Sequence, residues 1–242
     1  MIASFPMYLR DETRAAYDRF WSGIAARLPS GIEAPNSLQH NSNVWDQWQS
    51  PDLLLSQTCG LPYRTVLHDK VSLIGTPDYR LPGCPAGYYN SVLVMHRDKA
   101  TSDPTIWARE VLATNDKHSE SGWASAQRHM SSFDMCFEAV WISGSHRASA
   151  KGVAAGMAGI AAIDAQTWRM IQRWDEWSKK LVEVARTAPT PGLPLITAYT
   201  QHTELLFNAV SRQIEALNPN DRALLDLHGF TAIPKDAYLA VK

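Results

Sequence analysis

Short apolar runs alternate with segments of helical periodicity along the whole chain. The apolar runs that predict strands lie at residues 2–7, 53–55, 71–75, 91–96, 111–114, 137–142, 160–163 and 195–198. Apolar residues at helical spacing predict helices at residues 11–28, 45–48, 123–130, 147–156, 165–185, 203–217 and 221–228. Strands that alternate with helices predict an α/β fold built from mostly parallel sheets with helices on both faces.

Two segments interrupt this alternation and predict how the chain is divided. The two β/α blocks join near residues 97–104, and a Pro-rich stretch at 188–194 marks a second crossing. We therefore predict two lobes, the first formed by residues 1–97 with 195–242 and the second by residues 98–194. Sheets of this class place ligands beyond the carboxyl ends of their strands, so the loops that follow the strands are the expected site.

Composition narrows the class of protein further. The 242 residues carry 23 Lys and Arg against 24 Asp and Glu, so the net charge is −1 and nothing predicts a nucleic-acid partner. No stretch approaches the roughly 18 apolar residues of a membrane helix, so direct membrane insertion is not expected. The N-terminus has no basic and apolar leader, which predicts either a cytoplasmic protein or a periplasmic one whose leader was removed.

The loop at residues 114–123 carries the most informative chemistry. Ser119 and Ser121 stand between a predicted strand and a predicted helix start at Gly122. Hydroxyl groups beside the backbone N–H groups of a helix start bind oxyanions without a cationic side chain. The alternative is an ordinary serine cap, which the same residues supply.

A second loop, Ser143–His146, repeats this order of strand end, Gly turn and helix start. His146 adds a donor whose charge is adjustable near neutral pH. The alternative is again a cap, with a solvated His beside Arg147. Two such loops on adjacent strands favour one shared anion pocket.

Other strand ends supply further candidates. Asp164 follows the strand 160–163, where it is suited either to a ligand hydroxyl or ammonium group or to capping the next helix. Tyr8 and the turn Thr58-Cys59-Gly60 end two strands of lobe one and face the same predicted cleft. Trp123 is a weaker candidate, because an aromatic residue at helical spacing is more often part of the core.

Enzyme and metal signatures are missing from the sequence. It contains no GxSxG, P-loop or GxGxxG motif, and its His residues never fall at HExxH spacing. We therefore expect no catalytic residues, no cofactor and no metal site. Cys59 and Cys84 lie in different turns of lobe one, and whether they form a disulfide stays open.

The order of five segments resembles a known family. The segments are Ala3–Tyr8, Ser56–Gly60, Ser119–Gly122, Ser143–His146 and Ala162–Asp164. In this order they resemble the phosphonate-binding family, the substrate-binding proteins of phosphate, phosphite and phosphonate ABC transporters. The resemblance spans residues 2 to about 230, and it implies the two-lobed type II periplasmic-binding fold.

The resemblance also implies roles for the candidate residues. Ser119, Ser121 and the backbone at Gly122 would hold oxyanion oxygens, His146 would donate a further bond, and Asp164 would meet the other end of the ligand. The residues that would close from the other lobe are Tyr8, Thr58, Cys59 and Gly60. Trp123 stands where the family often has Tyr, and Glu120 adds a negative charge to the loop, which predicts repulsion of a dianion.

The resemblance therefore predicts a monomeric, non-enzymatic protein that closes two lobes on a small oxyanion-bearing solute for an ABC permease. Two alternatives use the same scaffold. One is an enzyme of the kind found in menaquinone and thiamin biosynthesis, and the other is a cytoplasmic ligand sensor.

Overall fold

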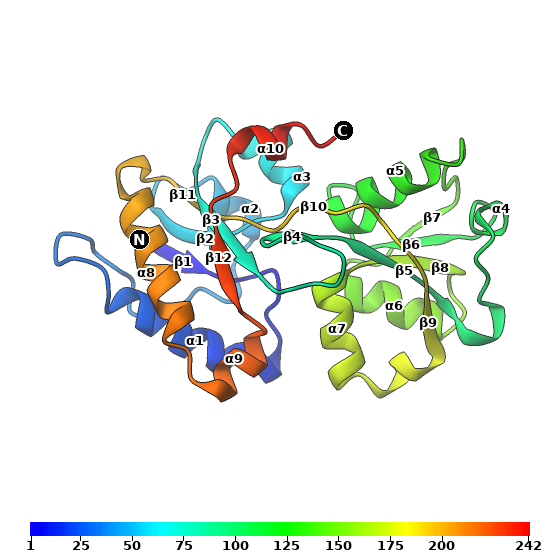
Figure 1. Cartoon of the computed structure of the whole chain (residues 1–242), viewed down its shortest axis with the longest axis horizontal. Coiled ribbons are helices and arrows are strands. Elements are labelled where there is room, and N and C mark those ends of the chain that lie inside the picture. Colours follow the sequence, from blue (N-terminus) through cyan, green and yellow to red (C-terminus); the bar gives the residue numbers. More distant parts are fainter. The chain divides into compact units, whose positions relative to one another are not determined.

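Each half of the fold pairs five strands into a separate sheet, and the computed structural model describes all 242 residues (Figure 1). Unit 1 comprises Met1–Arg80 and Pro191–Val241, and unit 2 comprises Leu81–Thr190 with Lys242. The sequence placed the first crossing at residue 97. It lies at residues 80–81 instead, because the strand Ser91–His96 pairs with strands of unit 2.

The sheet of unit 1 has the strand order β1-β2-β11-β3-β12. Its strands are β1 (Ile2–Ser4), β2 (Leu53–Gln57), β11 (Leu195–Thr197), β3 (Ser72–Asp78) and β12 (Gly229–Thr231). β1 runs parallel to β2, whereas β11 runs antiparallel to β2 and β3, and β12 antiparallel to β3. Every residue of β2 is buried, and its first three residues, Leu53–Leu55, are the apolar run that predicted the strand.

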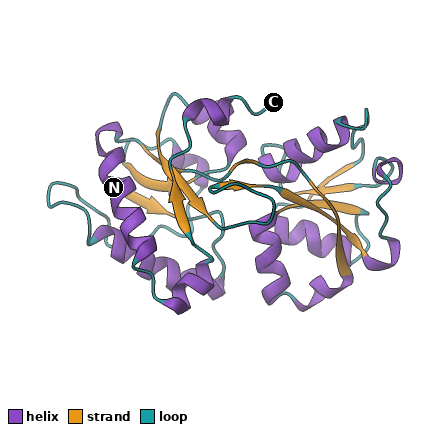
Figure 2. Cartoon of the chain, in the orientation of Figure 1, coloured by secondary structure: helices purple, strands orange, loops and turns teal.

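The helices of unit 1 border this sheet (Figure 2). They are α1 (Asp11–Ala25), α2 (Val44–Trp48), α3 (Gly60–Pro62), η1 (Tyr63–Leu67), η5 (Thr200–His202), α8 (Thr203–Glu215), α9 (Pro219–Leu225) and α10 (Lys235–Leu239). α1 packs against α8 and α9, burying Ala16, Phe20 and Ile24 at the spacing that predicted the helix.

The sheet of unit 2 has the order β7-β6-β8-β5-β9. Its strands are β7 (Val140–Ile142), β6 (Leu112–Thr114), β8 (Ile160–Asp164), β5 (Ser91–His96) and β9 (Leu181–Arg186). β6 runs parallel to β7 and β8, and β5 runs antiparallel to β8 and β9. Both sheets are therefore mixed, and the prediction of mostly parallel sheets is wrong. β5 and β11 run against their neighbours because each follows a crossing between the units.

Figure 1 shows α5 on one side of the unit 2 sheet and α6 and α7 on the other. The helices of this unit are η2 (Arg97–Lys99), α4 (Pro104–Trp107), the π-helix η3 (Glu120–Ala124), α5 (Ser125–Ser131), α6 (His146–Ala154), α7 (Ala165–Trp174) and η4 (Glu176–Lys180). β4 (Tyr88–Tyr89) and β10 (Thr190–Pro191) pair as a two-stranded ribbon. No helix of the chain has the length and apolar character needed to cross a membrane.

Two predicted elements of unit 2 are corrected. The predicted helix 165–185 ends at Trp174, and residues 181–186 form the strand β9, because they pair with β5. The predicted strand 137–142 begins only at Val140, because Phe137 contributes to the hydrophobic core instead, beside Leu93 and Trp107.

A half-buried ion pair joins the first helix of unit 1 to one of its last. Arg19 Nε on α1 donates to Asp221 Oδ2 on α9 at 2.9 Å, and the Asp221 side chain is only 4% exposed. The hydrogen bond from Arg19 lowers the pKa of Asp221, helped by Asn218 and opposed by burial.

We expect Asp221→Asn to lower the free energy of unfolding at pH 7 by about 1–3 kcal/mol, since it weakens a hydrogen bond to a charged group. The folded pKa lies below the unfolded value of about 3.9. The loss is therefore fully present above that value and disappears as the pH falls through the folded pKa. Urea unfolding at pH 7 and pH 3 measures it, with the exposed Asp52→Asn as the control. Equal losses at both pH values would contradict this account.

Candidate functional site

Three strands of unit 2 end at the same edge of its sheet. β6 is parallel to both β7 and β8, so the segments that follow all three meet at one edge. η3 follows β6, α6 follows β7 and α7 follows β8. The predicted residues at these three helix starts are Ser119, Ser121, Gly122, His146 and Asp164.

Residues 119–122, which we call the hydroxyl loop, form a buried hydrogen-bonded turn. Ser119 caps η3, and its Oγ accepts the N–H of Gly122 at 2.9 Å. Ser121 Oγ lies 2.8 Å from His146 Nε2 and 3.5 Å from Ser119 Oγ. The capping interpretation of Ser119 therefore holds. It also means that the Gly122 N–H, predicted to hold an oxyanion, already has an acceptor.

Two further serines, which were not predicted from the sequence, form hydrogen bonds with the backbone of the hydroxyl loop. Ser91 Oγ on β5 and Ser125 Oγ on α5 each lie 2.9 Å from the carbonyl oxygen of Ser121, and 2.8 Å from one another. Both residues are buried, so these bonds are protected from water and hold the loop in place. Ser125 stands four residues after Ser121, a spacing visible in the sequence, whereas the place of Ser91 follows only from the sheet.

Gly122 is required by a close approach rather than by an unusual backbone angle. A Cβ atom there would lie 2.0 Å from Asn115 Oδ1 and 3.0 Å from Thr114 Oγ1. Both of these residues belong to the end of β6 and the loop that follows it. A side chain at Gly122 would therefore require the Asn115 side chain to move and would crowd Thr114 Oγ1.

His146 is the first residue of α6, after the cap Ser145, whose Oγ accepts the N–H of Ala148 at 3.1 Å. The residue keeps some exposed surface, but its Nδ1 is buried. Burial lowers the pKa of His146 to about 4, and the Ala162 carbonyl opposes only part of this shift. His146 is therefore neutral at pH 7, and the expectation of a charge adjustable near neutrality is wrong.

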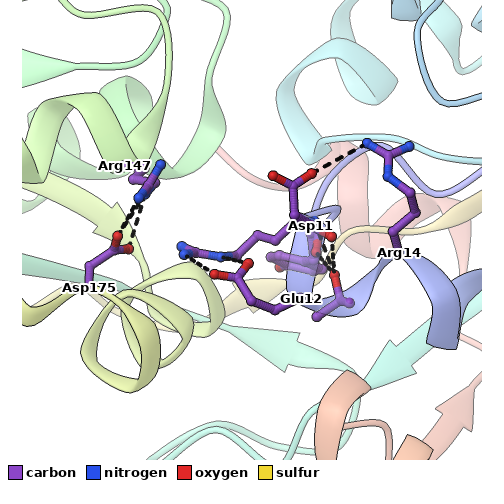
Figure 3. A network of polar contacts seen from close by, with 8 residues as sticks. Asp11, Glu12, Arg14, Arg147 and Asp175 are labelled. Carbon is purple, nitrogen blue, oxygen red and sulfur yellow. Dashed lines mark hydrogen bonds and ion pairs between the residues drawn. The ribbon is translucent and has the colours of Figure 1, made fainter.

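An ion pair anchors the helix that carries His146. Figure 3 shows the guanidinium of Arg147 facing the carboxylate of Asp175, just after α7. Arg147 Nε lies 2.9 Å and 3.1 Å from the two carboxylate oxygens, and the Asp175 side chain is only 3% exposed. Arg147 is thus engaged in joining α6 to the end of α7, rather than simply solvated beside His146.

The negative charge predicted in the loop is compensated. The Glu120 side chain is 2% exposed and forms an ion pair with Arg128 of α5. The sequence predicted the charge of Glu120 but not its pairing with Arg128, which lies eight residues further along the chain.

Asp164 and Trp123 have structural tasks in unit 2. Asp164 is 2% exposed, and its Oδ1 accepts the N–H of Thr167 at 2.8 Å, which caps α7. Trp123 packs, partly buried, against the hydrophobic core of the unit. No three His, Cys, Asp or Glu side chains are grouped so that they could hold a metal ion.

The candidates of unit 1 share one edge of that unit's sheet, because β1 and β2 are parallel. Tyr8, after β1, is 4% exposed, and its ring lies 5.0 Å from that of Tyr79. After β2, Thr58 is fully buried, Cys59 is the N-cap residue of α3, and Gly60 begins this helix. Cys59 and Cys84 do not form a disulfide.

Solved structures share this fold. A binding-protein component of a phosphonate ABC transporter from Pseudomonas aeruginosa is 14% identical, with a TM-score of 0.72, covering 98% of this chain and 83% of that one. PhnD1 from Prochlorococcus marinus, in complex with methylphosphonate, is 13% identical, with a TM-score of 0.72 and coverages of 98% and 94%. XAC2383 from Xanthomonas citri, bound to chloride ion, is 13% identical, with a TM-score of 0.68, covering 98% of this chain and 93% of that one. The predicted periplasmic-binding-protein fold, α/β with helix-flanked sheets, is confirmed.

The sequence defines the family within this fold. The family model for the periplasmic phosphonate substrate-binding proteins of ABC transporters matches residues 56–238, three quarters of the chain. The chain belongs to this family, whose members bind a solute for a transporter, and the predicted resemblance is confirmed. No curated protein matches the chain by sequence.

We expect Gly122→Ala to lower the free energy of unfolding by about 1–3 kcal/mol, because its methyl group would overlap Asn115 Oδ1. Gly31→Ala is the matched control, since no atom lies within 4 Å of the added methyl group, and a change within about 0.5 kcal/mol is expected there. Urea unfolding of both variants measures the difference. Equal stability of the two would show that the close approach is relaxed at no cost.

Protonation of His146 should destabilise the fold. Its folded pKa of about 4 lies below the unfolded value of about 6.5. Stability is therefore complete above pH 6.5 and falls as the pH is lowered toward 4, by up to about 3 kcal/mol. The pH profile of unfolding is compared with that of His146→Gln, which cannot titrate at this position. Parallel profiles for the two proteins would exclude the shift.

Proposed function

We propose that the hydroxyl loop and His146 bind the oxyanion of a small solute, with phosphonates as the first class to test. The observation that supports this proposal is the cluster of Ser119, Ser121 and His146, joined by contacts of 2.8 Å and 3.5 Å where three parallel strands end. Membership of a phosphonate-binding family gives the same chemical class. A methylphosphonate complex is known for PhnD1, which shares the fold.

The donors we assign to the anion are the uncharged hydroxyl groups of Ser119 and Ser121, the second oriented by the neutral imidazole of His146. Ser119 Oγ accepts the Gly122 N–H, so its own hydrogen is available to a ligand. When His146 donates from Nε2 to Ser121 Oγ, the Ser121 hydrogen is available as well. Because His146 is neutral at pH 7, a bound anion selects this tautomer without any uptake of a proton.

The remaining candidates keep the roles that the resemblance implies, as predictions. Asp164 would meet the part of the ligand that is not an oxyanion, and Trp123 stays a weaker candidate for contact with the ligand. Tyr8 and the residues 58–60 of unit 1 would complete the binding site when the units close. The segments at which the chain passes between the units, at residues 80–81 and 190–191, would absorb that movement.

We further propose that the protein acts by binding alone and delivers its ligand to an ABC permease. The family description supports both steps, because it assigns substrate binding and not catalysis. The same description supports action on the periplasmic side of the inner membrane.

We expect Ser121→Ala and His146→Ala each to weaken methylphosphonate binding by about 1–3 kcal/mol. Ser121→Ala removes a hydrogen bond to a charged ligand, and His146→Ala removes the group that orients the Ser121 hydroxyl. This weakening corresponds to a roughly 5- to 150-fold higher Kd. Isothermal titration calorimetry of the full chain measures it at constant pH. Ser131→Ala is the matched control, because this serine lies in an exposed position of the adjacent α5.

Binding that is unchanged in Ser121→Ala and His146→Ala would remove these residues from the site.

Before the variants are made, the wild-type chain is tested by thermal shift against phosphate, phosphite, alkyl- and aminophosphonates, sulfonates and carboxylates. A ligand at 100 times its Kd adds about 2.7 kcal/mol to the stability. A folded protein that responds to none of them would contradict the proposed function.

A further inference from the structure

An acidic residue stands between the two serines that we assign to the ligand. Glu120 separates Ser119 from Ser121 in the hydroxyl loop, and its side chain is 2% exposed. A carboxylate that is buried in this way is not screened by water, so its field acts on the whole loop. An unneutralised charge here would oppose the binding of any anion and would oppose a dianion most strongly.

Arg128 supplies the compensating charge from the far end of the helical segment. Glu120 begins η3 and Arg128 lies in the last turn of α5, so their ion pair spans both helices. A second nitrogen of the Arg128 guanidinium donates to the Lys242 carbonyl oxygen at 2.9 Å, which further fixes its position.

We propose that Arg128 determines whether the hydroxyl loop accepts an anion, by neutralising Glu120 rather than by contacting the ligand. Arg128 is in this sense a positioning and specificity-determining residue. The inference rests on the proposed function, since it concerns the same loop. It makes the loop a site of near-zero net charge, in which hydroxyl dipoles bind the anion and Arg128 is already engaged by Glu120.

The test is a double-mutant cycle of Arg128→Gln, Glu120→Gln and the variant that carries both, with Arg128→Lys as the conservative change. Methylphosphonate affinity is measured by calorimetry and folding by circular dichroism. We expect Arg128→Gln to raise the Kd about tenfold or more, because the buried carboxylate of Glu120 then loses its arginine counter-charge. Glu120→Gln leaves the positive charge of Arg128 uncompensated, so it should bind at least as tightly as the wild type. The double variant removes both charges and should bind within about threefold of the wild type, and Arg128→Lys should restore most of the affinity.

A second ligand separates electrostatics from structure. Methanesulfonate carries one negative charge, whereas methylphosphonate carries up to two. Arg128→Gln should therefore lose more affinity for methylphosphonate than for methanesulfonate, whereas damage to the loop would weaken both to the same extent.

Three results would overturn the inference. The double variant could bind as weakly as Arg128→Gln, Glu120→Gln could itself lose about tenfold in affinity, or both ligands could be affected equally. If Arg128→Gln does not fold, the comparison of wild type, Glu120→Gln and the double variant decides, since the inference requires the double variant to bind like the wild type and Glu120→Gln to bind no more weakly. A wild-type chain that binds no oxyanion refutes the proposed function and is recognised before the cycle begins.

Discussion

The parallel alignment of β6 with β7 and β8 is the constraint on which the candidate site depends. Because these strands end at one edge, two loops that are far apart in the sequence meet there, and Ser121 comes within 2.8 Å of His146. The polar groups at this edge are buried, so each needs a partner inside the unit. Ser91 and Ser125 meet this need for the Ser121 carbonyl, and Ser119 meets it for the Gly122 N–H. The polar groups of the hydroxyl loop that the fold must satisfy are thus also the ones we propose to bind the ligand.

The electrostatics of the loop follow from burial. A buried imidazole loses its proton, so His146 is neutral, and a buried carboxylate needs a counter-charge, which Arg128 gives to Glu120. The result is a site made of dipoles without an uncompensated formal charge. Without Arg128, the charge of Glu120 would repel an anion, and a dianion more strongly than a monoanion. We therefore assign the specificity of the loop to the Glu120–Arg128 pair.

Much of the fold could be predicted from the sequence, because buried strands such as β2 and β8 consist of apolar runs. Strand direction could not be predicted, since the antiparallel pairing of β5 and β11 depends on strands distant in the sequence, even though the Pro-rich stretch before β11 marked a crossing. Residues 181–186 have an apolar spacing compatible with a helix, and pairing with β5 makes them a strand.

The candidate residues at helix starts were predictable for a related reason. Ser119, His146 and Asp164 directly follow strands, and capping residues at such places are visible in a sequence. Their partners were not predictable, because Ser91 reaches Ser121 only through the sheet and Arg128 reaches Glu120 across two turns. The same local pattern also could not show that the Gly122 N–H is already bound by Ser119.

A crystal structure of the full chain in complex with methylphosphonate tests the central claim most directly. The account predicts anion oxygens within hydrogen-bonding distance of Ser119 Oγ and Ser121 Oγ, with Arg128 still paired to Glu120. An anion held by Arg128 or by another Lys or Arg side chain would contradict it.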